Sequence, residues 1–167
     1  MTELPPSRPL EEVTDIVYQA TKSRIMHAYG KVIEFLHVLK PQPYDEVLKI
    51  DLLLSEARDA IPQHLRLGTL EEMKNDPPYK LVERFVLLIF WHKAICILHR
   101  KFWDAEPVMG LNEEFNYSRK SCVVSSLALL ELQDQVCIFA SAVVMIALNL
   151  PFSTSRDIIK CLLANIL

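Results

Sequence analysis

The chain has 167 residues and a formal net charge of −3, and 51% of its residues are hydrophobic. This length suits one domain or part of a larger one, and the scattered basic residues argue against a nucleic-acid-binding face. Only 3 glycines occur, which argues against a turn-rich β architecture. We therefore expect an all-α, multi-helix globular fold.

The first half of the chain predicts a polar N-terminal segment and two helices. Residues 1–9 are polar and lack the apolar run of a signal peptide. Residues 10–39 predict a helix, because their apolar side chains recur at steps of three and four. Residues 44–61 repeat this spacing and predict a second helix, which Pro62 ends. We expect a connector over residues 63–75 that holds at most one short helical turn.

Residues 79–102 predict the central helix of the fold. Asp76 and the two prolines after it favour a helix start. The helix is apolar on nearly every face between Phe85 and Leu98, and such a helix must lie in the middle of a core. A loop over residues 104–114 is expected to follow it.

The C-terminal part predicts two further helices. Asn116 is a candidate cap for a helix over residues 117–148, and a capping-box pattern at Thr154 and Asp157 precedes a last helix that holds residues 158–166. The sequence stops inside an apolar run, so we expect residues 10–167 to be a helical domain that is truncated at its C-terminus and belongs to a larger domain.

The lengths of the apolar stretches bear on a membrane role, and the spacing of the cysteines and histidines bears on a metal site. The apolar runs 85–98 and 136–150 are too short to cross a bilayer, so no membrane role is expected. The four cysteines lie far apart and form no CxxC pair, which predicts reduced thiols and no metal cofactor. His92, Cys96 and His99 share one helix face; they could bind a metal, although core packing also explains them.

Motifs of enzymes are missing. The sequence has neither a phosphate-binding glycine loop nor a GxSxG nucleophile turn, so we expect no enzymatic activity and no catalytic residue. Four aromatic residues of the central helix could line a ligand pocket or simply pack in the core: Phe90, Trp91, Phe102 and Trp103.

Two blocks of sequence are more specific. The first is the helix 44–61 with Pro62-Gln63-His64-Leu65-Arg66 after it, and the second, downstream, is Ile97-Leu98-His99-Arg100-Lys101-Phe102 followed after a loop by Tyr117-Ser118-Arg119-Lys120-Ser121-Cys122. In this order, over residues 44–150, they resemble the regulatory domain, or middle homology region, of fungal zinc-cluster (Zn2Cys6-type) transcription factors. Lys101 stands where the family usually has proline, and the six-cysteine zinc cluster is absent.

The resemblance implies a domain that regulates transcription by RNA polymerase II in the nucleus without contacting DNA itself. DNA would be bound only through the zinc-containing domain that this chain lacks. The implied partners are other domains or transcriptional co-regulators, with a small-molecule effector as a further option. The alternative is a stand-alone helical interaction or small-ligand-binding protein unrelated to transcription.

The residues that match the family are His99, Arg100, Phe102, Tyr117, Ser118, Arg119 and Cys122. We interpret them as structural fasteners between the end of the central helix and the start of the next one; a phosphate or metabolite site is the alternative. Arg100 near a helix C-terminus could donate to loop carbonyls. On that hypothesis Arg100→Ala should cost about 1–3 kcal/mol of stability.

Overall fold

The computed structural model describes residues 15–40, 42–68, 76–103 and 115–147, with side chains in the last range as far as Ile138. Within these ranges the chain forms α-helices and short 3-10 helices and no strand, which confirms the all-α prediction. The chain divides into two compact units, residues 1–126 and 127–167. The first unit holds every described helix except the part of the last one from residue 127 onward, and the candidate site lies within this unit.

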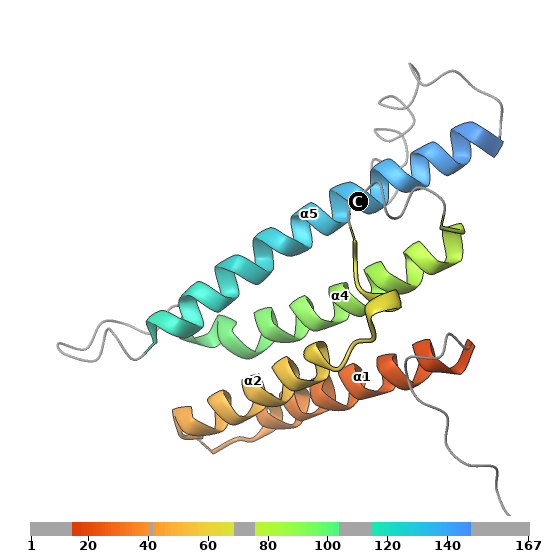
Figure 1. Cartoon of the computed structure of the whole chain (residues 1–167). Coiled ribbons are helices and arrows are strands. Elements are labelled where there is room, and N and C mark those ends of the chain that lie inside the picture. The colour runs from red at the N-terminus through yellow and green to blue at the C-terminus, as the bar shows by residue number, and fades with distance from the viewer. Residues whose placement is uncertain (1–14, 41, 69–75, 104–114, 148–167) are drawn as a thin grey trace, which may run out of the picture. The chain divides into compact units, whose positions relative to one another are not determined.

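Helices α1 (Asp15–His37) and α2 (Tyr44–Asp59) form an antiparallel pair (Figure 1). Their buried faces carry the predicted three-and-four spacing, with Ile25 and Val32 from α1 and Val47 and Leu54 from α2 fully buried. Pro43 precedes α2 without a side-chain cap, and two acidic residues, Asp45 and Glu46, lie in its first turn, where negative charge is favourable to the helix dipole.

The end of α2 is held by the segment that follows it. The 3-10 helix η1 (Gln63–Leu65) turns the chain and buries Leu65. Arg66 then reaches back, and its guanidinium donates to the carbonyl oxygens of Ile61 and Asp59, each at 2.9 Å. These bonds satisfy carbonyls that a helix end leaves without partners.

Helix α4 (Pro78–His99) is the central helix, as predicted. It packs against α1, α2 and η1, and its buried residues include Phe85, Leu87 and Leu98. Trp91 also lies in the core, where its indole nitrogen donates to the Leu54 carbonyl at 2.8 Å. Core packing therefore accounts for Trp91, whereas Trp103 is 54% exposed.

Some helix ends in the structure differ by a few residues from the ends predicted from the sequence. The central α-helix stops at His99, three residues earlier than predicted, and the chain tightens into the 3-10 helix η2 (Arg100–Phe102) because the Trp103 amide bonds to the Arg100 carbonyl. Asn116 is the first residue of α5 (Asn116–Ala147) rather than its cap. The predicted turn near residue 70, the loop 104–114 and the last helix, with residues 158–166, lie outside the described residues.

Helix α5 carries exposed apolar side chains, among them Val124, Leu127 and Leu130, each more than half exposed. Its stretch Asn116–Ile138, with a mean hydropathy of 1.3, is long and apolar enough to cross a bilayer by length and composition alone. A single helix of this kind is weak support for a membrane role, because helices of soluble proteins pass the same test. The expectation of no membrane role stays a prediction.

Candidate functional site

The family-matching residues gather at the end of the first unit where α1 meets α2. The chain turns from α1 into α2 at this end, and α4 finishes here, since Lys101 lies over the Phe35 ring at 4.0 Å. The start of α5 is fixed at the same end by Ser118, which hydrogen-bonds to Tyr44 at the start of α2. Residues from three helices therefore meet around the last turn of α4.

A buried polar network joins these helices. His99 and Ser118 have no exposed surface, and Asp51 of α2 is 7% exposed. The His99 Nε2 atom lies 2.9 Å from Asp51 Oδ1, and His99 Nδ1 lies 2.9 Å from Ser118 Oγ. Two tyrosines complete the network: the Tyr44 hydroxyl lies 2.7 Å from Ser118 Oγ, and the Tyr117 hydroxyl donates to Asp51 Oδ2 at 2.5 Å.

The charge on Asp51 sets the direction of the hydrogen bonds. Burial acts to raise the pKa of Asp51, but hydrogen bonds from His99 and Tyr117 and attraction to His99 outweigh it, so that the pKa falls below its ordinary value of 3.8. Asp51 is therefore an acceptor only, and His99 Nε2 must donate to it. The Ser118 hydroxyl lies within hydrogen-bonding distance of both His99 Nδ1 and the Tyr44 hydroxyl, so it can donate to one of them and accept from the other.

Every polar side chain of this network has a partner. That matters because a buried donor or acceptor without a partner costs about 1–3 kcal/mol. The same partners link α2, α4 and α5 at residues that are far apart in sequence. The arrangement supports the fastener interpretation for His99 and Ser118, although it does not test it.

Aromatic rings pack beside the network. Phe102 lies edge-on to Tyr44, with ring centroids 5.2 Å apart, and stacks on Phe115 at the same distance. Tyr44 also meets Phe115 edge-on at 5.1 Å. Such ring pairs add about 0.5–1.5 kcal/mol each beyond their buried area. Phe102 thus contributes apolar packing to the junction, beside the hydrogen bonds of its neighbours.

The remaining family-matching residues differ in their surroundings. Arg119 is half-buried and donates to the Phe102 carbonyl at 3.4 Å, which ties α5 to η2. Cys122 faces Cys96 of α4. Arg100, in contrast, is exposed, and no hydrogen bond from its guanidinium to another described residue is found. The burial that the Arg100 hypothesis requires is missing, since the end of α4 turns this side chain to solvent.

Sequence reasoning missed Asp51 and the hydroxyl of Tyr44. Asp51 stands four residues after Val47 and three before Leu54, both fully buried, so it falls on the apolar face of α2. A carboxylate at such a position needs a buried partner. The spacing could have flagged Asp51, but the sequence could not name His99 as its partner 48 residues away.

Asp51, His99 and Ser118 are the residue types of a hydrolase triad, in hydrogen-bonding order. A nucleophile must reach a substrate carbonyl, however, and the Ser118 hydroxyl is fully buried and bonded to Tyr44. The geometry is therefore that of a core network. His92, Cys96 and His99 are likewise not brought together as metal ligands: within the described residues no group of three or more candidate ligands is found, and His99 is taken by Asp51 and Ser118.

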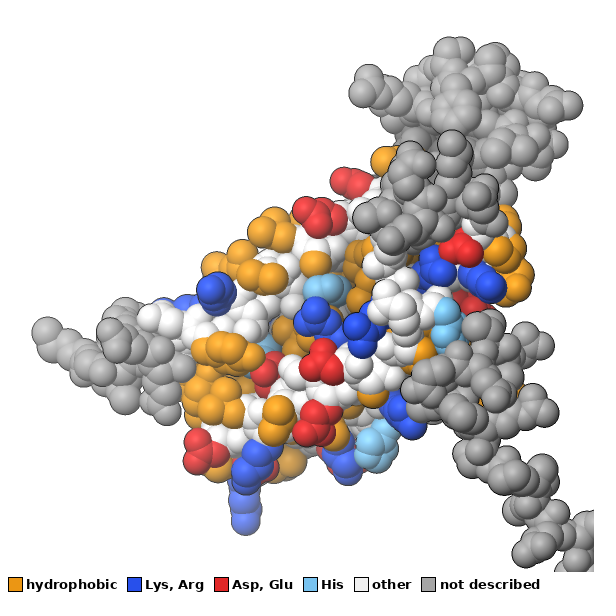
Figure 2. Space-filling view, in the orientation of Figure 1, with side chains coloured by type: hydrophobic (Ala, Val, Ile, Leu, Met, Phe, Trp, Pro, Cys, Tyr) orange, Lys and Arg blue, Asp and Glu red, His pale blue; other side chains and the backbone are white. Residues whose placement is uncertain are grey.

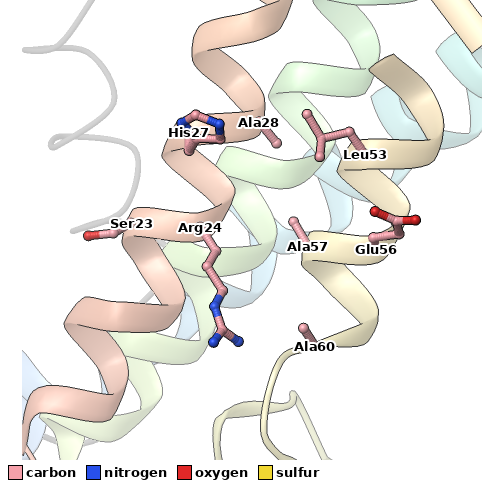
Figure 3. A pocket seen from close by; sticks show the side chains of 8 residues that line it. All are labelled: Ser23, Arg24, His27, Ala28, Leu53, Glu56, Ala57 and Ala60. Atoms are coloured by element: carbon pink, nitrogen blue, oxygen red, sulfur yellow. The ribbon is translucent and has the colours of Figure 1, made fainter. Parts of the chain in front are cut away.

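A groove with a volume of about 470 Å³ lies between α1 and α2. Figure 3 shows Ala57 of α2, with Ala60 just after that helix, on the side of the groove opposite α1, and Arg24 of α1 extending along the opening. His27 and Glu56 add polar groups at the rim. The groove does not include the polar network, so the two are separate features of the fold.

Comparison with known proteins gives relatives of one kind. The chain is 34% identical over 134 residues to the Zn(2)-C6 fungal-type transcription factor mpsB of Macrophomina phaseolina. The chain is homologous to one region of fungal zinc-cluster transcription factors. It is also 35% identical over 135 residues to the pyrrolocin cluster transcription factor fsdR of a fungal species (strain NRRL 50135) and 31% identical over 134 residues to the equisetin cluster transcription factor eqxF of Fusarium heterosporum.

The matches to these transcription factors cover most of this chain and a small part of each relative. They include 80% of the chain but 18% of mpsB, and 81% of the chain but 17% of fsdR. The chain thus spans less than a fifth of the length of the curated relatives that it matches. No family model and no solved structure matches it.

Proposed function

We propose that this chain is a regulatory region of a fungal transcription factor, one that controls transcription by RNA polymerase II in the nucleus without contacting DNA. The observation that carries the proposal is the match of four fifths of the chain to less than a fifth of transcription factors such as mpsB. A Zn(2)-C6 cluster is named for six cysteines, and this chain has 4. The zinc, and the contact with DNA, would therefore belong to another part of the protein.

Surface charge agrees with a role away from DNA. On the face drawn in Figure 2, basic and acidic side chains of the described residues are interspersed, and the whole chain carries a net charge of −3. Binding to nucleic acid depends on neutralising phosphates with clustered lysine and arginine. Other domains of the factor or transcriptional co-regulators are the partners that fit this surface better, and a catalytic role is not proposed.

The names of two relatives refer to the pyrrolocin and equisetin clusters. We infer that the factor to which this chain belongs controls a cluster of genes of comparable kind.

A reporter experiment tests the regulatory role. The full chain is placed between an unrelated DNA-binding domain and an unrelated activation domain, and reporter output is compared with that of an inert spacer of equal length. The proposal predicts that the chain changes the output and that His99→Ala, which disrupts the buried network, reduces this change. Asp59→Ala, at an exposed aspartate of α2, is the matched control. Output equal to that of the spacer would favour the stand-alone interaction protein instead.

The groove between α1 and α2 favours a second function, the binding of a small effector. Its volume of about 470 Å³ falls within the range of roughly 300–1,000 Å³ typical of ligand sites. Ala57→Leu would fill the groove from α2. Effector binding there predicts that a ligand which raises the melting temperature of the natural chain fails to do so for this variant, while the unliganded melting temperatures stay similar.

A further inference from the structure

Two cysteines face each other across the contact between α4 and the first part of α5. The Cys96 Sγ atom lies 3.8 Å from the Cys122 carbonyl oxygen, and the Cys122 Sγ atom lies 3.9 Å from the Cys96 carbonyl oxygen. Because each thiol reaches the main chain of the other residue, the two cysteines must be directly opposite. Both are half-buried, and Cys96 Sγ is also 3.4 Å from the hydroxyl of exposed Ser126.

The polar network holds this pair in register. Cys96 precedes His99 by three residues, and Cys122 follows Ser118 by four, so each cysteine lies one helical turn from a member of the His99–Ser118 hydrogen bond. A disulfide needs two Cβ atoms roughly 3.5–4.5 Å apart and cannot form between residues held apart by the backbone. Here each Sγ atom lies within 3.9 Å of the other cysteine's carbonyl oxygen, so the fold brings the two residues face to face.

We propose that Cys96 and Cys122 form a dithiol modification site, which a hydroperoxide converts into a disulfide that ties α4 to α5. The first thiolate attacks the peroxide, the O–O bond breaks, and a sulfenic acid forms as water or an alcohol leaves. The second thiol then attacks the sulfenic sulfur, the S–O bond breaks, and the hydroxide leaves as one water with the proton of this thiol. The two thiols lose two electrons and the peroxide gains them. This site does not depend on the proposed role in transcription.

The surroundings of Cys96 predict how the reaction depends on pH. Burial raises the pKa of the Cys96 thiol; the Ser126 hydrogen bond opposes this rise, and the Cys122 thiol adds to it. Thiolates are the reacting species, so the reaction should be slow at neutral pH and should accelerate as the pH rises towards 9.

Peptide mapping of the full chain tests the site. Cys122 and Cys137 lie in the same tryptic peptide, residues 121–156, so a crosslink to that peptide could involve either cysteine. The experiment therefore uses the Cys137→Ser variant, which also controls for the loss of a cysteine outside the proposed pair. The folded protein is treated with dilute hydrogen peroxide, quenched with N-ethylmaleimide and digested. We expect a crosslink between the peptides 94–100 and 121–156 that dithiothreitol removes and that Cys96→Ser or Cys122→Ser abolishes.

The rate of crosslink formation distinguishes two thiols that the fold holds together from thiols that meet only by random collision. In the folded chain the crosslink should form at least about tenfold faster than in the same chain unfolded in urea, because folding holds the two thiols together. Circular dichroism confirms that each variant is folded before oxidation. A crosslink that forms no faster in the folded chain, or an equally fast crosslink to Cys161, would overturn the proposal.

Discussion

Replacing His99 with alanine is the most direct test of the buried network as a fastener. The change would leave Asp51 with Tyr117 as its remaining donor and Ser118 with Tyr44 as its remaining partner. Leaving a buried donor or acceptor without its partner typically costs about 1–3 kcal/mol, and more when that group is charged, as Asp51 is. Since Asp51 keeps Tyr117 as a donor and 7% of its surface stays exposed, we expect a loss near the upper end of that range, about 3 kcal/mol.

Urea denaturation of the full chain, followed by circular dichroism, measures this loss. A double-mutant cycle with Asp51→Ala and His99→Ala isolates the pair, and we expect a coupling energy of about 1.5–3 kcal/mol for a hydrogen bond to a charged group. Asp59→Ala is the matched control on the same helix and should change stability by at most about 0.5 kcal/mol. Single variants no more destabilised than this control, or a coupling energy near zero, would refute the fastener.

Further predictions address charge, surface and partners. Because the pKa of folded Asp51 lies below 3.8, the stability that its charged form contributes is present above that pH and is lost as the pH falls through the folded pKa. The difference in unfolding free energy between the natural chain and Asp51→Asn, measured by urea denaturation, should therefore shrink between pH 5 and pH 3. A constant difference would contradict this. Arg100→Ala should change the free energy of unfolding by at most about 0.5 kcal/mol, since its side chain is exposed; a loss of about 1–3 kcal/mol would instead restore the hypothesis drawn from the sequence. The chain alone should give no sequence-selective gel shift at ~150 mM salt, where phosphate contacts are weakened; a selective shift would show that it contacts DNA directly.

The helices themselves were predictable from local sequence. Helix periodicity depends on residues three and four apart, so the spacing around Ile25, Val47 and Leu54 was enough to identify buried faces that the structure confirms. The same holds for α4: its own side chains are apolar on nearly every face, so the sequence predicted that it lies in the centre of the core. Boundaries were less certain, as at His99, where a change to 3-10 hydrogen bonding ended the α-helix early.

The sequence by itself therefore determined the helical class, the central position of α4 and the resemblance to fungal transcription factors. Only the tertiary structure decided which side chains meet: Asp51 with His99, Tyr44 with Ser118, and Cys96 with Cys122. The physical reason is that a repeat of 3.6 residues fixes the face on which a side chain lies. The partner on another helix depends on how far the packed helices are shifted along each other, and no local pattern encodes that shift.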